Sequence, residues 1–193
     1  QSGEEKDLSL RSMLEIFNKA ECGDPQDVRS WPVWDPLRPH LSAVTTYADQ
    51  YDIAEPTTRL MNQLGVFLLT KASYEDAEPL MKQALAIDEA SFGPNHPNVA
   101  RDLNNLASLL QATNRIEDAE PLMKRALAID ETSYEPNHPD VAGDLNNLAL
   151  LLQATNRLKE AEPLMRRHLV ILLKLTRSTG HVHPHLKQAR KNY

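Results

Sequence analysis

The sequence contains 193 residues, of which 41% are apolar, with a single cysteine and a net charge of −6 at neutral pH. These values suit one compact domain or a short repeat array, and they exclude an internal disulfide and any metal site built on paired thiolates. The acidic balance disfavours a nucleic-acid-binding surface, which needs a surplus of Lys and Arg. No apolar run approaches the length of a membrane span, and the charged start, Gln1 to Asp7, does not resemble a signal peptide. We therefore expect no membrane contact and, by default, a cytoplasmic protein.

Residues 1–56 form a segment of their own, which we interpret as an N-terminal helical cap or linker. Its apolar side chains recur at helical spacing in two short stretches. They are Leu10, Met13, Leu14 and Phe17 in the first stretch and Leu37, Leu41, Val44, Ala48 and Tyr51 in the second. Between these helices we expect a loop that carries Trp31 and Trp34. Such rings can pack over the end of the fold or stack on a ligand, and we favour packing.

An internal repeat of 42 residues dominates the rest of the chain. Residues 94–131 match residues 136–173 at 27 of 38 positions, and Leu60, Leu64 and Gly65 belong to a more diverged copy one period earlier. Repeats of this length are typical of solenoids, in which each copy forms one supersecondary unit.

Each copy predicts two helices joined by a turn. The apolar side chains that show helical spacing are Val99, Leu103, Leu106, Ala107 and Leu110 in the first helix and Ala119, Leu122, Met123, Ala126 and Leu127 in the second. The stretch between them holds the turn-prone Asn114, and a His-Pro pair starts the next helix. One hairpin cannot bury both of its apolar faces, so neighbouring hairpins must stack.

The sequence therefore predicts an all-α fold, a right-handed superhelical solenoid of antiparallel helix hairpins with a concave groove. Residues 57–182 contain three repeats, which we place at 57–98, 99–140 and 141–182. Residues 183–193 follow a three-residue insertion and open like one further helix, so we expect a C-terminal partial repeat that caps the fold.

The motifs of the repeat resemble a known family. Asp102-Leu-Asn-Asn-Leu-Ala, Glu120-Pro-Leu-Met, Arg125-Ala-Leu-Ala-Ile and Asn95-His-Pro are similar to the 42-residue tetratricopeptide repeats of kinesin light chains. The resemblance covers about Thr57 to Leu173, and it implies a module that binds a protein or a peptide.

Two flanking segments are similar to a class of bacterial signalling proteins. Pro25 to His40 resembles the segment before the repeats in STAND-class NTPases, which join an NB-ARC-type nucleotide-binding module to a C-terminal repeat sensor. Thr179 to His185 resembles the ending of the same group. The resemblance implies the ligand-sensing region of a larger NTPase, although the sequence holds no G-x-x-x-x-G-K-[ST] phosphate loop. The alternative is a free-standing adaptor or scaffold like a kinesin light chain.

Polar side chains at equivalent positions of the first helix in each repeat predict a peptide-binding groove. The family resemblance implies that these positions bond the peptide, and an amide suits this task because it offers both donors and an acceptor. The candidate groove residues are Arg59, Asn62, Gln63, Phe67, Arg101, Asn104, Asn105, Ser108, Asn146, Asn147 and Leu150. One asparagine of each pair could instead bond a neighbouring helix, and both roles stay open. The arginines favour an acidic ligand, and this bias ends at Gly143 in the third repeat.

The sequence predicts no enzyme, no cofactor, no metal site and no small-molecule substrate. Ser, His and Asp recur with the repeat and do not converge in one asymmetric constellation. His96 and His138 are separated by a hairpin width of about 10 Å, too far for one zinc ion. His181, His183 and His185 are closer together, but no carboxylate or thiolate accompanies them.

The C-terminal region is basic. From Arg166 to Tyr193 the chain contains seven Lys and Arg residues and no Asp or Glu. We interpret this region as a solvated helix end that its own dipole favours, with contact to RNA or acidic lipid as the alternative.

Overall fold

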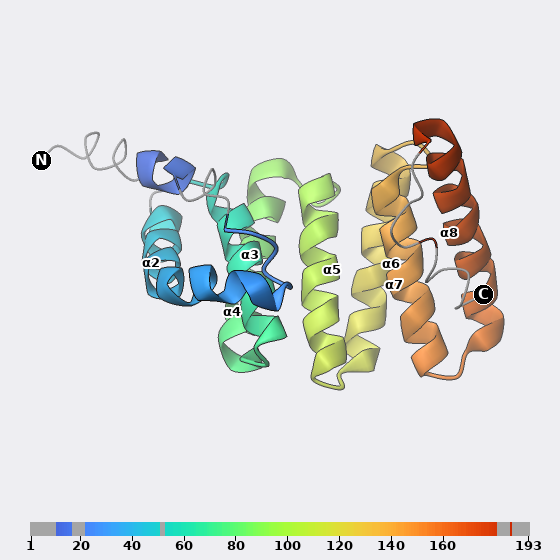
Figure 1. The fold of residues 1–193 in the computed structure, drawn as a ribbon, viewed down its shortest axis with the longest axis horizontal. Coiled ribbons are helices and arrows are strands. Elements are labelled where there is room, and N and C mark those ends of the chain that lie inside the picture. Colours follow the sequence, from blue (N-terminus) through green and yellow to red (C-terminus); the bar gives the residue numbers. More distant parts are fainter. Residues whose placement is uncertain (1–10, 17–21, 51–52, 181–185, 187–193) are drawn as a thin grey trace, which may run out of the picture. The chain divides into compact units, whose positions relative to one another are not determined.

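The computed structural model describes residues 11–16, 22–50, 53–180 and 186, and every regular element in this part of the chain is a helix (Figure 1). The chain divides into two compact units, residues 1–94 and residues 95–193. No helix among the described residues is long and apolar enough to cross a membrane.

Besides the helical residues 11–16, the described part of the first unit contains a short 3-10 helix and three longer α-helices. These are η1 (Val28–Ser30), α2 (Trp31–Gln50), α3 (Thr57–Thr70) and α4 (Tyr74–Phe92). Both α2 and α4 pack against α3. Residues 11–16 are helical as expected, whereas Leu10 and Phe17 lie outside the described residues.

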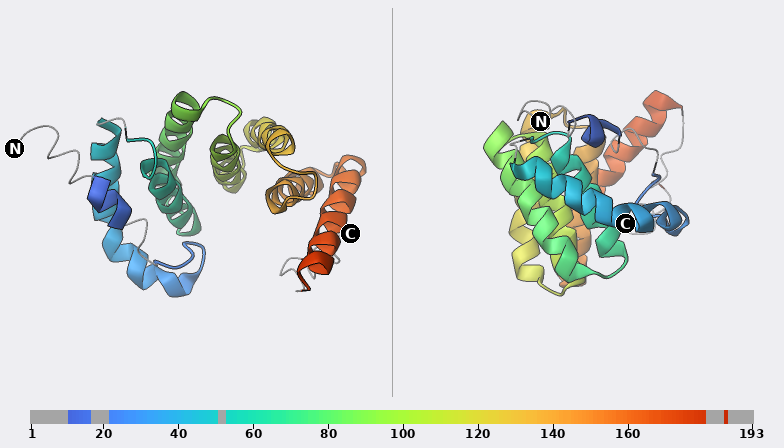
Figure 2. Two further views of the ribbon diagram at one scale, coloured as in Figure 1. Left: turned by 90° about the horizontal axis from the view of Figure 1, so that it is seen from above. Right: turned by 90° about the vertical axis from the view of Figure 1, so that its left-hand side faces the viewer.

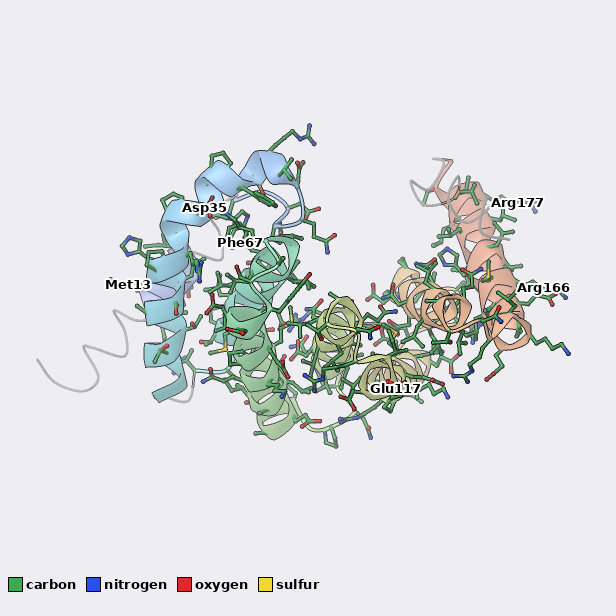
Figure 3. All side chains as sticks on the ribbon, turned by 90° about the horizontal axis from the view of Figure 1, so that it is seen from below. Met13, Asp35, Phe67, Glu117, Arg166 and Arg177 are labelled. Atoms are coloured by element: carbon green, nitrogen blue, oxygen red, sulfur yellow. The ribbon has the colours of Figure 1, made fainter. Side chains whose placement is uncertain are left out.

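The loop expected around the two tryptophans is wrong, because α2 begins at Trp31 and continues through Pro36 and Pro39. Trp34 is 2% exposed and stacks on the fully buried Phe67 of α3 at a ring-centroid distance of 5.7 Å. Trp31 meets the same ring edge-on at 6.4 Å. Figure 3 shows Phe67 near the end of α3, beside the start of α2. Burial of these large rings offsets the hydrogen bonds that the prolines remove from the helix, and the packing role predicted for the tryptophans is confirmed.

The second unit consists of two helix hairpins. The first pairs α5 (Pro97–Ala112) with α6 (Ile116–Ser133), the second pairs α7 (Pro139–Ala154) with α8 (Leu158–Thr179), and α6 packs on α7 (Figure 2). The expected histidines and prolines define the starts of α5 and α7. The Nδ1 atoms of His96 and His138 accept the backbone N–H groups two residues further on at 3.2 and 3.3 Å, and a proline follows each histidine.

The apolar positions predicted from helical spacing form the interior of these hairpins. Val99, Leu103, Leu106 and Ala107 of α5 are buried, as are their counterparts on α7. The predicted all-α fold of tandem helix hairpins is therefore confirmed.

The described part of the basic C-terminal region is largely paired with the repeats themselves. Arg166 bonds Glu162 at 2.9 Å on the same helix, and Arg167 bonds Glu131 of α6. Lys174 donates to Asn137 at 3.1 Å. Figure 3 shows Arg166 and Arg177 along the outside of α8. These pairings fit a solvated outer face, and residues 187–193 lie outside the described part.

Leu106 tests whether the hairpin interior carries the stability of the fold. It is 5% exposed between α5 and α6, so Leu106→Asp would bury a charge without a partner. We expect the free energy of unfolding to fall by more than about 3 kcal/mol, measured by urea denaturation with circular dichroism. The matched control Leu158→Asp alters a leucine that is 57% exposed at a helix start and should change stability by less than about 0.5 kcal/mol. Equal losses in the two variants would contradict this account of the core.

Candidate ligand-binding site

A cavity of about 420 Å³ lies between the first helices of the two hairpins in the second unit. Its walls come from α5 and α7, and the end of α6 closes one side. Its lining includes Arg101, Asn104 and Asn105 on α5, Asp130 and Tyr134 at the end of α6, and Asp140, Gly143, Asp144 and Asn147 on α7. The cavity therefore collects side chains from the repeat positions that sequence analysis selected, together with acids that it did not.

Asn104 bridges the two hairpins. Its Nδ2 atom donates to Oδ1 of Asp144 at 2.5 Å, from α5 to α7. Ser108 Oγ donates to the backbone carbonyl of Asn104 at 2.9 Å, one turn later on the same helix. Of the two roles left open for the asparagines, the structure gives Asn104 the bond to a neighbouring helix.

Asp130 and Asp144 form a buried pair of carboxyl groups at the cavity wall. Their side chains are 4% and 3% exposed, and the two groups share a hydrogen bond. Neither Oδ1 of Asp130 nor Oδ2 of Asp144 has a donor among the described side chains and backbone.

Burial shifts the titration of this pair. Loss of solvent raises the pKa of Asp144 to about 7, opposed by the Asn104 hydrogen bond and reinforced by the charge of Asp130. Loss of solvent likewise raises the pKa of Asp130 to about 6, with a further rise from Asp140 and a small opposing effect of His138. One proton is therefore shared between the two acids near neutral pH.

Arg101 already has an acidic partner. Its Nε and Nη2 atoms both lie 3.2 Å from Oδ1 of the fully buried Asp102. Tyr134 forms another wall, and its ring stacks on His138 at a centroid distance of 3.9 Å. The lining thus contains several acids and one arginine, and that arginine already has an acidic partner. This composition disfavours the acidic ligand that the arginines of the sequence predicted.

The structure brings three of the predicted asparagines together at this cavity and leaves the others away from its lining. Asn104, Asn105 and Asn147 contribute to the lining. Asn146 is half-buried outside the lining, and Leu150 is 42% exposed on the same helix.

In the first unit, two predicted groove residues are buried and do not offer their side chains to a ligand. Phe67 is enclosed by the tryptophans of α2, and Asn62 is 3% exposed and donates to the Thr58 carbonyl at 2.9 Å. Their assignment to an accessible groove is wrong, because helical spacing identifies a face of α3 without showing which neighbour covers it. Arg59 is exposed and Gln63 is half-buried.

Comparison with known families identifies the repeat. A family model described as tetratricopeptide repeat matches residues 56–132 and 103–174, which together span more than half of the chain. The chain belongs to the tetratricopeptide repeat family. Tetratricopeptide repeats indicate a protein-interaction scaffold, and they are typically non-catalytic.

Solved structures of similar fold include other tetratricopeptide proteins. The nearly identical TPR-like repeats of a kinesin-light-chain protein from Podospora anserina are 20% identical, with a TM-score of 0.70 over 95% of this chain and 83% of that one. BtubC (BKLC) from P. vanneervenii is 18% identical, with a TM-score of 0.65 over 94% and 76% of the two chains. The apo form of RapI is 16% identical, with a TM-score of 0.64 over 87% and 63%. These identities show a shared fold alone, and a search of curated proteins finds no match.

Sequence reasoning missed the buried acids, although their signal was present in this tetratricopeptide array. Asp130 and Asp144 have counterparts 42 residues earlier at Asp88 and Asp102. A carboxylate that recurs next to the apolar stripe of a helix indicates a position at the edge of the core. Within the described ranges, no group of three or more His, Cys, Asp or Glu residues is arranged to hold a metal ion, and His181, His183 and His185 lie outside those ranges.

The raised pKa values of the acid pair predict how stability depends on pH. Asp130 and Asp144 hold protons in the folded state well above the ordinary pKa of 3.8. The stability that these bound protons provide is therefore present at low pH and is lost as the pH rises through about 6 to 7. Asp144→Asn keeps an oxygen for Asn104, removes one charge and can donate to Asp130. Relative to wild type, we expect this variant to gain about 1–3 kcal/mol at about pH 8 and much less at about pH 5.

Urea denaturation at the two pH values measures this difference. Asp140→Asn is the control, because it removes a charge from the same helix at a side chain that is 57% exposed. The charge of Asp140 raises the pKa of both buried acids from an exposed position, so the effect of this control should be smaller than that of Asp144→Asn. A difference between Asp144→Asn and wild type that stays constant with pH would contradict the shared-proton pair.

Proposed function

We propose that this tetratricopeptide chain is a protein- or peptide-binding module, and that its ligand lies along the amide-bearing faces of α5 and α7. The cavity of about 420 Å³ carries the proposal, because Asn105 and Asn147 reach its lining from equivalent positions 42 residues apart. Amides spaced by one repeat can bond successive backbone groups of an extended ligand without the cost of burying a charge.

The two asparagines of the second repeat have different roles in this proposal. Asn104 belongs to the scaffold, because its amide bonds Asp144 across the hairpins. Asn105 and Asn147 belong to the binding face, and Asn146 is the counterpart of Asn104 one repeat later.

The remaining segments support the binding repeats. We assign the repeats to residues 57–98, 99–140 and 141–182, with residues 1–56 as a cap or linker and residues 183–193 as a partial repeat. The stacking of Trp34 on Phe67 supports a capping role for the first segment. Leu186 is buried in one apolar cluster with Val141 and Leu172, which supports a capping role for the last.

The binding face can be tested with selected peptides. A random peptide-display library would be selected on the immobilised full chain, and a synthetic copy of a selected peptide titrated by calorimetry. Changing Asn105 and Asn147 to Ala together should cost about 0.5–1.5 kcal/mol for each lost hydrogen bond, or roughly fivefold to 150-fold in affinity. The thermal midpoint should change little, because alanine favours the helix and no apolar contact is lost.

Asn104→Ala provides the contrast. It removes the bridge to Asp144 and leaves that acid without its amide donor, so it should lower the thermal midpoint. Failure of the library to yield any binding peptide would count against the proposed function. Unchanged affinity in a stable Asn105/Asn147 double variant would exclude these two amides from the binding face.

We infer further that the module is the ligand-sensing region of a bacterial STAND-type NTPase. The similarity of Pro25 to His40 and of Thr179 to His185 to that class supports this assignment. A free-standing adaptor or scaffold is the alternative hypothesis.

Sequencing the gene upstream of the codon for Gln1 distinguishes the two hypotheses. A G-x-x-x-x-G-K-[ST] motif in the same reading frame is the expected result, and a start codon close to Gln1 without such a motif would favour the adaptor.

A further inference from the structure

One repeat has lost the arginine that its neighbours carry. Arg59 and Arg101 occupy equivalent positions in the first and second repeats, and Gly143 occupies that position in the third. Arg101 bonds the buried Asp102, the next residue along the helix. The residue after Gly143 is the buried Asp144, so the third repeat keeps the acid without the arginine that would pair with it.

The space of the missing side chain is open. Gly143 lines the cavity, and a Cβ atom added there would meet nothing within 4 Å. The main chain at Gly143 lies in the middle of α7, where glycine is less favourable than alanine by about 1 kcal/mol. Neither crowding nor a turn therefore requires glycine at this position.

Three buried acceptor atoms without donors belong to residues that line this opening. Oδ2 of Asp144, Oδ1 of Asp130 and Oδ1 of Asn104 are buried, and none of them has a hydrogen-bond partner among the described residues. Both aspartates are more than nine-tenths buried, and all three residues line the cavity. Three acceptors match the three N–H donors of an ammonium group, and they equally suit a guanidinium group.

The charges around the pair favour a cation. Asp140 on α7 also lines the cavity, and its charge acts on both buried acids. His138 acts weakly on Asp130, and Arg101 of α5 is engaged with Asp102. At the end of α6, the Tyr134 ring offers an apolar surface for an alkyl stem.

Packing does not explain the acid on α6. The third repeat carries Leu172 at the position of Asp130, and this leucine is buried in an apolar cluster on α8. Replacing buried charged groups by apolar ones of similar size is often neutral or stabilising. An apolar residue is thus compatible with this position in the third repeat, whereas the first and second repeats carry buried acids there, Asp88 and Asp130.

We propose that the cavity beside Gly143 binds a lysine or arginine side chain of a peptide ligand, with its cationic group between Asp130 and Asp144. The ligand then supplies a positive charge beside Asp144, as Arg101 does beside Asp102 in the second repeat. This inference rests on the proposed peptide-binding function and replaces the acidic ligand expected from the sequence with a basic one.

Binding of the cation displaces the proton that the two acids share. The ligand's positive charge takes the place of the proton between the carboxylates, and the proton leaves to the buffer. Affinity for a basic ligand should therefore increase as the pH rises from about 5 to about 8. Binding should also release a proton, which the buffer takes up. Proton release is measured directly by calorimetry in buffers of different ionisation enthalpy.

Peptide pools test the ligand class. Four nine-residue pools would carry Lys, Arg, Gln or Glu at the central position and random residues elsewhere, and binding to the full chain would be measured by fluorescence anisotropy. We expect the Lys and Arg pools to bind about tenfold to a hundredfold more tightly than the Gln pool, and the Glu pool to bind most weakly. Equal binding of all four pools, or a preference for Glu, would overturn the inference.

Gly143→Arg gives the sharpest variant, because it restores the arginine of the other repeats and places a cation of the chain itself in the cavity. We expect it to abolish the preference for basic pools while retaining binding to the Gln pool. Gly143→Ala is the matched control, since it adds helix propensity without charge and should keep the preference. Asp144→Asn should reduce the preference and the proton release together.

The outcomes separate this inference from the function on which it rests. No binding of any pool to the wild-type chain would argue against the peptide-binding function itself. Binding of all pools with no effect of Gly143→Arg would leave that function standing and overturn the basic site.

Discussion

Burial of the second apolar face of each helical hairpin is the constraint on which the second unit depends. Leu127 of α6 and Tyr134 just after it pack against an apolar cluster that includes Val141 and Leu145 of α7. Asp130 lies between Leu127 and Tyr134 at helical spacing, and Asp144 lies one turn after Val141. The apolar contact that joins the hairpins therefore carries both acids into the interface, and their pairing is a consequence of the stacking.

The magnitudes show which charged groups matter. Arg157 bonds Glu120 and Glu160 at 2.6 Å and ties α8 to α6, but these side chains are partly or largely exposed, and such pairs contribute at most about 1 kcal/mol each. The acid pair is buried, and removing its shared proton leaves two like charges in a medium that screens them poorly. The buried pair of Asp130 and Asp144, and not the exposed ion pairs of Arg157, therefore sets how the stability of the second unit depends on pH.

Sequence analysis predicted the fold well because a helix pattern depends on local spacing. The starts of α5 and α7 at the His-Pro pairs and the buried stripe through Leu103 follow from residues close together in the chain. The course of α2 could not be predicted in this way, because two prolines indicate a break and the contact with Phe67, which compensates for them, lies far away in the sequence. Likewise, the pattern placed Asn104 and Asn105 on a polar face, but the choice between a neighbouring helix and a ligand depends on Asp144, which is 40 residues away.

The second repeat keeps the ion pair between Arg101 and Asp102, and the third repeat has Gly143 and Asp144 at these positions. Such a difference between copies of a repeat suggests a place to look for function. Gly143 gives α7 a lower helix propensity than the arginine of the second repeat would give, and it leaves the buried Asp144 without the arginine partner that Asp102 has. In the proposed site, a bound cation would pair with Asp144 and contact groups on α5, α6 and α7 together, because Asn104 and Asp130 meet at Asp144. Since a ligand stabilises the state that binds it, occupancy of this cavity strengthens the junction between the two hairpins. Ligand recognition and the rigidity of the second unit are thereby coupled through a single buried carboxyl pair.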